Sequence, residues 1–159
     1  MRYVNYFPEE FPFMPSTTNE ALNQVLIDLD KSLLSYVAEA WPWSSQADAT
    51  VRGAVEELAV RRRESVGRLA DQLVEREWPV DFGTYPTEYT DLHYVGLDYL
   101  LSQLVHDQKR VTAGIERTLR AASGDAQAKP LLEEILNSER DTLARLQKLP
   151  RSRTPVSAA

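Results

Sequence analysis

The sequence contains no cysteine and only two histidines, His93 and His106, in 159 residues. The missing thiols exclude disulfides, thiolate catalysis, iron–sulfur clusters and zinc sites with cysteine ligands. Two imidazoles also leave little material for a histidine-rich metal site or for acid–base catalysis. We therefore expect His93 to make a structural hydrogen bond and His106 to lie at the surface.

Long apolar runs and an excess of positive charge are also missing. No segment approaches the roughly 20 apolar residues of a membrane helix, and the first residues, MRYVNYFPEEF, lack the apolar stretch of a secretion signal. The formal net charge of −6 argues against nucleic acid and anionic membranes as partners, because both attract basic surfaces. We expect a cytoplasmic protein that binds neither of them.

Recognisable catalytic motifs are absent as well. The sequence has no phosphate-binding loop, no glycine-rich nucleotide motif and no Ser–His–Asp pattern. We therefore predict no catalytic residues, no cofactor and no bound metal, and we expect that the protein is not an enzyme.

What the chain does have is the composition of one globular domain, with 43% hydrophobic and 26% charged residues. Residues 1–16 are rich in aromatic residues and proline, which predicts an extended arm and not a helix. We expect this arm to pack on its own domain, and packing on another subunit is the alternative. Residues 150–159 are polar and are predicted to form a frayed tail.

Residues 17–149 carry the three- and four-residue spacing of amphipathic helices, and no segment alternates as a strand does. The first helix is predicted at about residues 18–41, with Thr17 and Glu20 at capping-box spacing. The second is capped by Asp48 or Ser45 and continues to residue 78. The third covers about residues 91–122 after a Thr90 cap. The fourth begins between residues 125 and 130 and ends at residue 149. Four such helices predict an all-α four-helix bundle.

Each predicted helix has a polar residue in or beside its apolar stripe near mid-length. Arg62 interrupts the second stripe, so it requires an acceptor, because an unpaired buried charge is costly. Counting from the two helical hairpins places all four polar residues in one cross-section of the bundle. The sequence thus predicts a buried polar cluster, whose members are Asp30, Arg62, Gln108 and Glu139. We expect Arg62 and Glu139 to form a buried pair, and an Arg62 that reaches the surface with only its stem buried is the alternative.

This layout resembles the ferritin-like superfamily, which includes rubrerythrins and miniferritins. In that superfamily the first and third helices each supply a Glu, and the second and fourth each supply Glu-x-x-His, to hold two metal ions. The resemblance places Asp30 and Gln108 at the single-carboxylate positions. It places Arg62-x-x-Ser65 and Glu139-x-x-Thr142 at the Glu-x-x-His positions. Both histidines and two of the four carboxylates are therefore replaced, and a permanent cation stands at a ligand position.

The resemblance also implies that the second and third helices are parallel and joined by a crossover. The linker over residues 79–90 spans about 40 Å when extended, which is roughly the length of the second helix. We therefore predict a ferritin-like crossover between helices 2 and 3.

The expected function is that of a ferritin-like bundle without an intact di-metal site, acting as a binding or structural protein. A homodimer is a possible assembly, and no motif indicates a ligand. The alternative is a metal-dependent oxidoreductase or iron-handling protein with an unconventional site.

Overall fold

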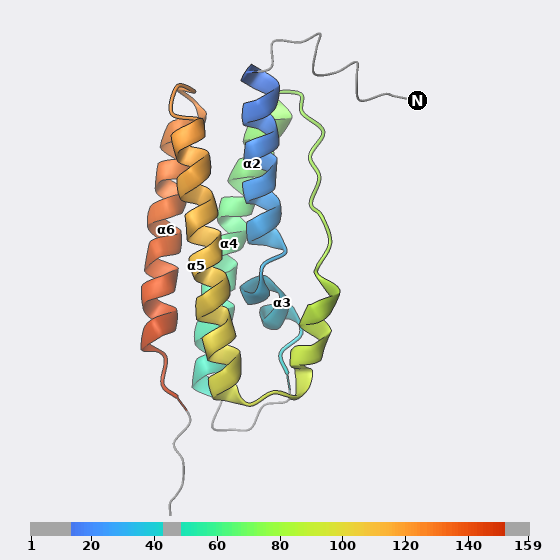
Figure 1. Cartoon of the computed structure of the whole chain (residues 1–159), viewed down its shortest axis with the longest axis vertical. Helices are drawn as coiled ribbons and strands as arrows, with labels where there is room; N and C mark the ends of the chain where they lie inside the picture. The colour runs from blue at the N-terminus through green and yellow to red at the C-terminus, as the bar shows by residue number, and fades with distance from the viewer. Residues whose placement is uncertain (1–13, 43–48, 152–159) are drawn as a thin grey trace, which may run out of the picture.

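The structure, a computed structural model, describes residues 14–42 and 49–151, with residues 14–16 and 94 described by their backbone only (Figure 1). No strand occurs in these residues, so the predicted all-α fold class is confirmed. Within the same residues, no helix combines the length and the apolar character that crossing a bilayer requires. The elements in chain order are α2 (Met14–Asp30), α3 (Leu33–Glu39), α4 (Ala49–Glu75), the 3-10 helix η3 (Thr87–Tyr94), α5 (Leu97–Ala121) and α6 (Ala128–Lys148).

The long helices α2, α4, α5 and α6 lie side by side (Figure 1). Helices α2 and α3 pack on both α4 and α5, and α6 packs on α5 and α4. In Figure 1, α4 and α5 both begin at the lower end and finish at the upper end. The segment between them, residues 76–96, descends along α2 and α3 and contains η3.

The first predicted helix is wrong in two respects. It begins at Met14, so Thr17 lies inside the helix and residues 14–16 do not belong to an extended arm. It is also interrupted after Asp30, where Ser32 starts the separate helix α3. The Ser32 hydroxyl accepts a hydrogen bond from the Ser35 amide at 3.2 Å and donates one to the Leu29 carbonyl at 2.8 Å. A serine that satisfies backbone groups in this way competes with a continuous helix. The rest of the predicted arm, residues 1–13, lies outside the described residues, as do Ser45, Asp48 and residues 152–159.

Helix α4 ends at Glu75, three residues before the predicted end, in a Schellman turn. The Trp78 amide donates to the Leu73 carbonyl at 3.0 Å, and the Glu77 amide donates to the Val74 carbonyl at 2.9 Å. This geometry requires a left-handed residue, and Glu77 supplies it with φ of 60°. The helix therefore stops by turn geometry before Pro79 is reached.

The third predicted helix is also divided. Thr90 lies inside η3 and does not cap a long helix, since α5 begins after Gly96. The predicted start of the fourth helix is confirmed, because α6 begins at Ala128. Its first turn is held by the Asp125 carboxylate, which accepts hydrogen bonds from the Gln127 and Ala128 amides.

The first part of the descending segment is held against α2. The side-chain amide of Asn23 donates to the backbone carbonyl of Asp81 at 2.9 Å, and the backbone amide of Asp81 donates to the side-chain oxygen of Asn23 at 2.9 Å. Two residues later Gly83 has φ of 71°, and a Cβ placed there would lie 2.8 Å from Cγ2 of Ile27. The chain thus approaches α2 so closely that only glycine fits.

The core consists of two apolar clusters stacked along the helices. One contains Leu29, Val66, Val111 and Leu136, and the other contains Leu33, Leu58, Leu104 and Leu146, each with further members. Four helical segments build the core: α2 with α3, α4, α5 and α6. In each of them, a buried polar residue lies in sequence between the residues of the two clusters. We call these residues the polar layer: Ser32, Arg62, Gln108 and Glu139.

Candidate functional site

The polar layer is organised around Arg62, which lies in the middle of α4 and is 2% exposed. Its Nε donates to Oε2 of Glu139 at 3.3 Å, and its Nη1 donates to Oγ of Ser32 at 2.7 Å. Its Nη2 donates to both Oε1 of Glu139 and Oε1 of Gln108. The guanidinium therefore meets Glu139 through two nitrogens, which is the strongest geometry for an arginine–carboxylate pair.

Gln108 of α5 closes the network on the other side of Glu139. Its Nε2 donates to the Glu139 backbone carbonyl at 3.0 Å and to Glu139 Oε1 at 2.8 Å. Since its Oε1 accepts from Arg62, the glutamine uses its carbonyl and its amino group at once. Among the described residues, no side-chain nitrogen or oxygen of the polar layer is buried without a partner. The layer is thus a neutral, internally satisfied unit, as a buried charge requires.

The structure brings together three of the four residues predicted to form the cluster: Arg62, Gln108 and Glu139. Asp30 does not join them. Its carboxylate pairs with Lys31 at 2.8 Å, and its side chain is 25% exposed. The helix break turns Ser32 inward instead, and Ser32 was not among the predicted residues. Serine is favoured at helix N-termini, and Ser32 lies in the middle of the apolar stripe of the first predicted helix. This combination is the sequence signal that could have identified Ser32 as the site of a helix break.

The layer does not provide the ligands of a di-metal centre. Ser65 and Thr142, at the predicted histidine positions, are both buried. Only one carboxylate, that of Glu139, is present in the layer, and it is already paired with a cation that cannot lose its proton. In the part of the chain that the structure describes, no three side chains of the His, Cys, Asp or Glu type are grouped so as to hold a metal ion.

A second, partly buried interaction joins the end of α4 to the start of α6. Arg76 Nη1 and Nη2 donate to the two carboxylate oxygens of Asp125, each at 2.9 Å, and Nη1 also donates to Asn19 at 3.0 Å. These hydrogen bonds from Arg76, followed by those from the Ala128 and Gln127 amides, lower the pKa of Asp125 against the opposing effect of burial. The Arg76 Nε is buried without a partner among the described residues. The pair fixes the start of α6 and offers no open site.

Tyrosines gather where the descending segment passes α3. The Tyr36 hydroxyl and His93 Nε2 share a hydrogen bond of 2.9 Å, which confirms a structural role for His93. The rings of Tyr85 and Tyr89 lie 5.2 and 5.4 Å from that of Tyr36. Burial is the largest cause that raises the pKa of Tyr89 to about 12, and burial together with Glu39 raises that of Tyr85. Both phenols are therefore neutral near pH 7 and serve as packing and hydrogen-bonding groups.

Tyr99 is exposed, and the side chain of Tyr94 lies outside the described residues. His106 is exposed, as predicted.

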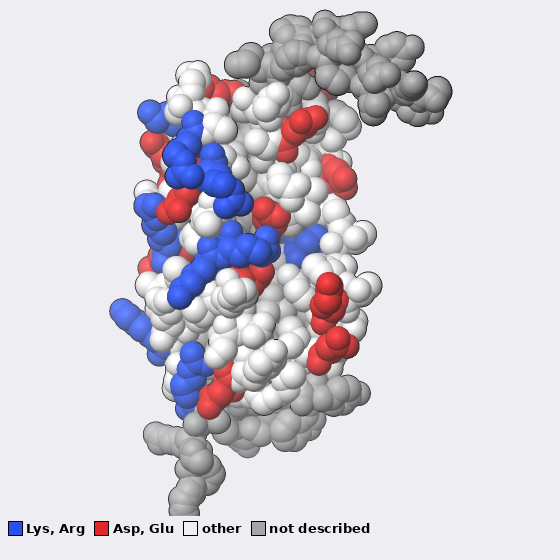
Figure 2. All heavy atoms as spheres, viewed as in Figure 1, with Lys and Arg blue, Asp and Glu red and all other residues white. Residues whose placement is uncertain are grey.

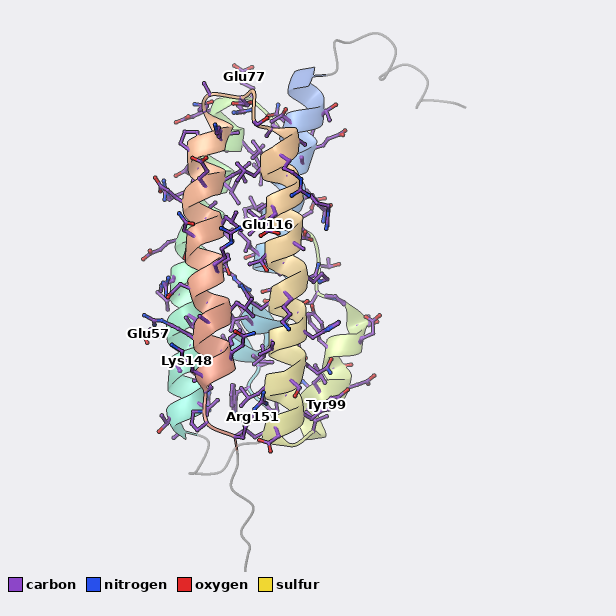
Figure 3. The ribbon with its side chains drawn as sticks, turned by 60° about the vertical axis from the view of Figure 1, so that its left-hand side comes forward. Glu57, Glu77, Tyr99, Glu116, Lys148 and Arg151 are labelled. Atoms are coloured by element: carbon purple, nitrogen blue, oxygen red, sulfur yellow. The ribbon has the colours of Figure 1, made fainter. Side chains whose placement is uncertain are left out.

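Two grooves lie between α4 and α6. The lower one has a volume of about 230 Å³ and is mainly apolar, with Glu57 and Lys148 on its two sides (Figure 3). The upper one has a volume of about 360 Å³ and is lined mainly by polar and charged residues, including Arg68 and Glu134, which pair at 2.7 Å. No residue of the polar layer lines either groove. The layer is therefore enclosed by helices and not reached from these surfaces.

Comparison with protein-family models, with curated proteins and with solved structures finds no match for this chain. The resemblance to the ferritin-like superfamily thus rests on the residue pattern of the sequence alone.

Proposed function

We propose that this chain is a four-helix bundle with ferritin-like connectivity, in which an internal ion pair takes the place of the di-metal centre. We further propose that it acts as a binding or structural protein and not as a metal-dependent oxidoreductase. The observation that carries the proposal is the position of the Arg62 guanidinium, which is held by Glu139, Gln108 and Ser32 in the middle of the core.

The chemistry of this arrangement supports the proposal directly. A di-metal centre needs several carboxylate or imidazole ligands around a shared volume. Here a guanidinium engages the carboxylate of Glu139 and the amide oxygen of Gln108. A metal ion entering this volume would meet a fixed positive charge that cannot be removed by deprotonation.

The path of the chain supports the proposed connectivity. Helices α4 and α5 begin at the same end in Figure 1, and the segment between them descends the length of the molecule. A parallel pair of neighbouring helices requires such a long connection. The hydrogen bonds between Asn23 and Asp81 and the close approach of Gly83 to Ile27 show that this connection is held against α2.

The test is elemental analysis of the full-length protein purified from medium supplemented with iron, manganese and zinc. We expect well below about one metal ion per chain, because one paired carboxylate cannot hold a transition metal against competing ligands. One or two ions per chain that disappear in Glu139→Gln, but remain in the exposed control Glu133→Gln, would overturn the proposal. That result would favour an oxidoreductase or iron-handling protein with an unconventional site.

A further inference from the structure

Positive and negative charges are separated along this chain. Residues 77–108 contain no lysine or arginine, and their acidic residues are Glu77, Asp81, Glu88, Asp91, Asp98 and Asp107. The next segment, residues 109–121, contains four basic residues and one acidic residue, Glu116. The first segment includes the descending connection and η3, and the second is the upper half of α5. The descending connection and the upper half of α5 therefore carry charges of opposite sign.

On one face of the molecule, Figure 2 shows most of the blue side chains over α5 and α6, with some red ones among them, and mainly red side chains, with one blue group, along α2 and the descending connection. We call the exposed basic residues of α5 the cationic stripe: Lys109, Arg110, Arg117 and Arg120. We call the exposed acidic residues of the other side the acidic edge: Glu20, Asp81, Glu88 and Asp91. The cationic stripe belongs to α5, and the acidic edge belongs to α2, the descending connection and η3, which are the elements over which Figure 2 shows the blue and the red side chains.

Within the described residues, most of these side chains form no ion pair. Arg110 pairs with Asp107 at 2.9 Å and with Asp28 of α2 at 3.9 Å, and on the neighbouring helix Arg140 pairs with Glu116 at 2.8 Å. Among the described residues, the other basic side chains of the cationic stripe and all four of the acidic edge form no ion pair: Lys109, Arg117, Arg120, Glu20, Asp81, Glu88 and Asp91. A face that is positive on one half and negative on the other, with few internal pairs, favours an oppositely patterned partner.

The pattern of this face is self-complementary. Consider a two-fold axis that lies in front of this face and runs parallel to the helices. Rotation about it turns a second copy to face the first, so that the left half of each copy lies opposite the right half of the other. Each cationic stripe then meets the acidic edge of the other copy, and the contact occurs twice, as in an isologous dimer. Phe82, which is 46% exposed between Asp81 and Gly83, adds an apolar group to the same acidic segment.

Nucleic acid fits this face poorly. A phosphate backbone that followed the cationic stripe would run beside the acidic edge, and the chain as a whole carries a net charge of −6. A second copy carries both signs in the required arrangement. We propose that two copies of this chain dock through this face, with the cationic stripe of each on the acidic edge of the other. This proposal rests on surface charge and not on the polar layer, so it can fail without affecting the proposed function.

The experiment is sedimentation equilibrium of the full chain at ionic strengths of about 0.1 M and about 1 M, where the Debye length falls from about 10 Å to about 3 Å. We expect a dimer whose dissociation constant rises about tenfold or more at high salt. The double variant Arg117→Glu/Arg120→Glu should dissociate at low salt. The control Arg52→Glu/Arg63→Glu makes the same change in net charge on exposed positions of α4, which lies behind α5 in Figure 1, and it should remain a dimer.

A mixing experiment separates complementarity from simple repulsion. The variant Glu20→Lys/Glu88→Lys reverses charge on the acidic edge and should also be monomeric by itself. Mixed with Arg117→Glu/Arg120→Glu it should form a heterodimer, because the reversed stripe of one variant then meets the reversed edge of the other, and the unchanged stripe meets the unchanged edge. Circular dichroism establishes that each variant keeps its helix content. A wild-type protein that is monomeric at low salt, or a dimer that persists in both charge-reversed variants, would overturn the proposal.

Discussion

Arg62 and Glu139 form an ion pair between α4 and α6 in which each side chain is 1% exposed. Gln108 of α5 contacts both partners, and Ser32 accepts a hydrogen bond from the guanidinium between α2 and α3. A single buried cation on α4 thus contacts α5, α6 and the junction between α2 and α3. Sliding any of these helices along its axis would leave the charge without its acceptors, so the layer specifies the relative register of the helices.

Removing one member of this pair is expected to destabilise the fold strongly. Arg62→Met leaves a buried carboxylate and Glu139→Leu leaves a buried guanidinium, and each should reduce the free energy of unfolding by about 3–5 kcal/mol. The double variant Arg62→Met/Glu139→Leu should cost much less than the sum, because it leaves neither charge unpaired. Urea denaturation of the wild type and the three variants measures the coupling.

The size of the coupling is the decisive quantity. Coupling of several kcal/mol is expected for a direct buried pair, whereas effects that add within about 0.5 kcal/mol belong to residues that do not interact. The second result would contradict the contact between Arg62 and Glu139. The exposed pair Arg52–Glu56 on α4 is the control and should couple by less than about 1 kcal/mol.

The sequence predicted the helices and the centre of the polar layer because both follow from periodicity. Apolar residues at helical spacing identify the buried face, and a charged residue on that face can only be satisfied by another polar residue at the same level. Counting along antiparallel helices therefore placed Arg62, Gln108 and Glu139 near one another. The structure shows these three in direct hydrogen-bonding contact.

Local backbone geometry could not be predicted in the same way. The break after Asp30 depends on Ser32 and on Asp107, whose carboxylate accepts a hydrogen bond from the Leu33 amide at 3.0 Å across 74 residues of sequence. Periodicity gives no information about such a distant acceptor. The break moved Asp30 out of the cluster and Ser32 into it, and the division of the third helix into η3 and α5 has the same kind of origin.

Gly83 is expected to be the position in the descending connection that is most sensitive to a small side chain. Gly83→Ala would place Cβ 2.8 Å from Ile27 and force an L-residue into φ of 71°, so the free energy of unfolding should fall by about 1–3 kcal/mol. Gly67→Ala in α4 is the matched control. A Cβ at Gly67 meets no atom within 4 Å, and this exposed helical substitution should stabilise the protein by about 0.5–1 kcal/mol.

The cause of the Gly83 effect can be resolved by changing its neighbour. In an Ile27→Ala background, Gly83→Ala should reduce the free energy of unfolding by less than it does in the wild type. The steric contact with Ile27 is then absent, and only the cost of the positive φ remains. Equal effects of Gly83→Ala and Gly67→Ala in thermal or urea denaturation would show that the connection does not lie against α2 as described.

Acid should weaken the attachment of α6 through Asp125. The hydrogen bonds from Arg76 lower the pKa of Asp125 below its ordinary value of 3.8. Its contribution to stability is therefore present above pH 3.8 and is lost as the pH falls through the lower value in the folded state. Asp125→Asn, which keeps a side chain suited to helix capping, should destabilise the protein at about pH 6 and have much less effect near about pH 2. A difference in the free energy of unfolding that stays constant over this range would contradict the shift.

Glu77 is expected to be a site where substitution stabilises the protein. It is exposed and adopts φ of 60° at the end of α4, a conformation that costs a residue with a Cβ about 1 kcal/mol or more. Glu77→Gly removes this strain, and after allowance for the greater freedom of glycine in the unfolded chain it should raise the free energy of unfolding by about 0.5–1 kcal/mol. Differential scanning calorimetry should detect the corresponding rise in Tm.

The charge of Glu77 offers a competing explanation for such a gain, because a carboxylate near a helix C-terminus interacts unfavourably with the helix dipole. Glu77→Ala removes the charge but keeps the Cβ, whereas Glu77→Asn removes the charge and tolerates the left-handed conformation better. If backbone strain is the cause, stability should increase in the order Ala, Asn, Gly, with Ala close to the wild type. If Ala stabilises as much as Gly, the Schellman turn carries no strain at Glu77 and the gain comes from the helix dipole. Repeating the comparison at about 1 M salt separates the two, since the dipole effect is screened and the effect of φ is not.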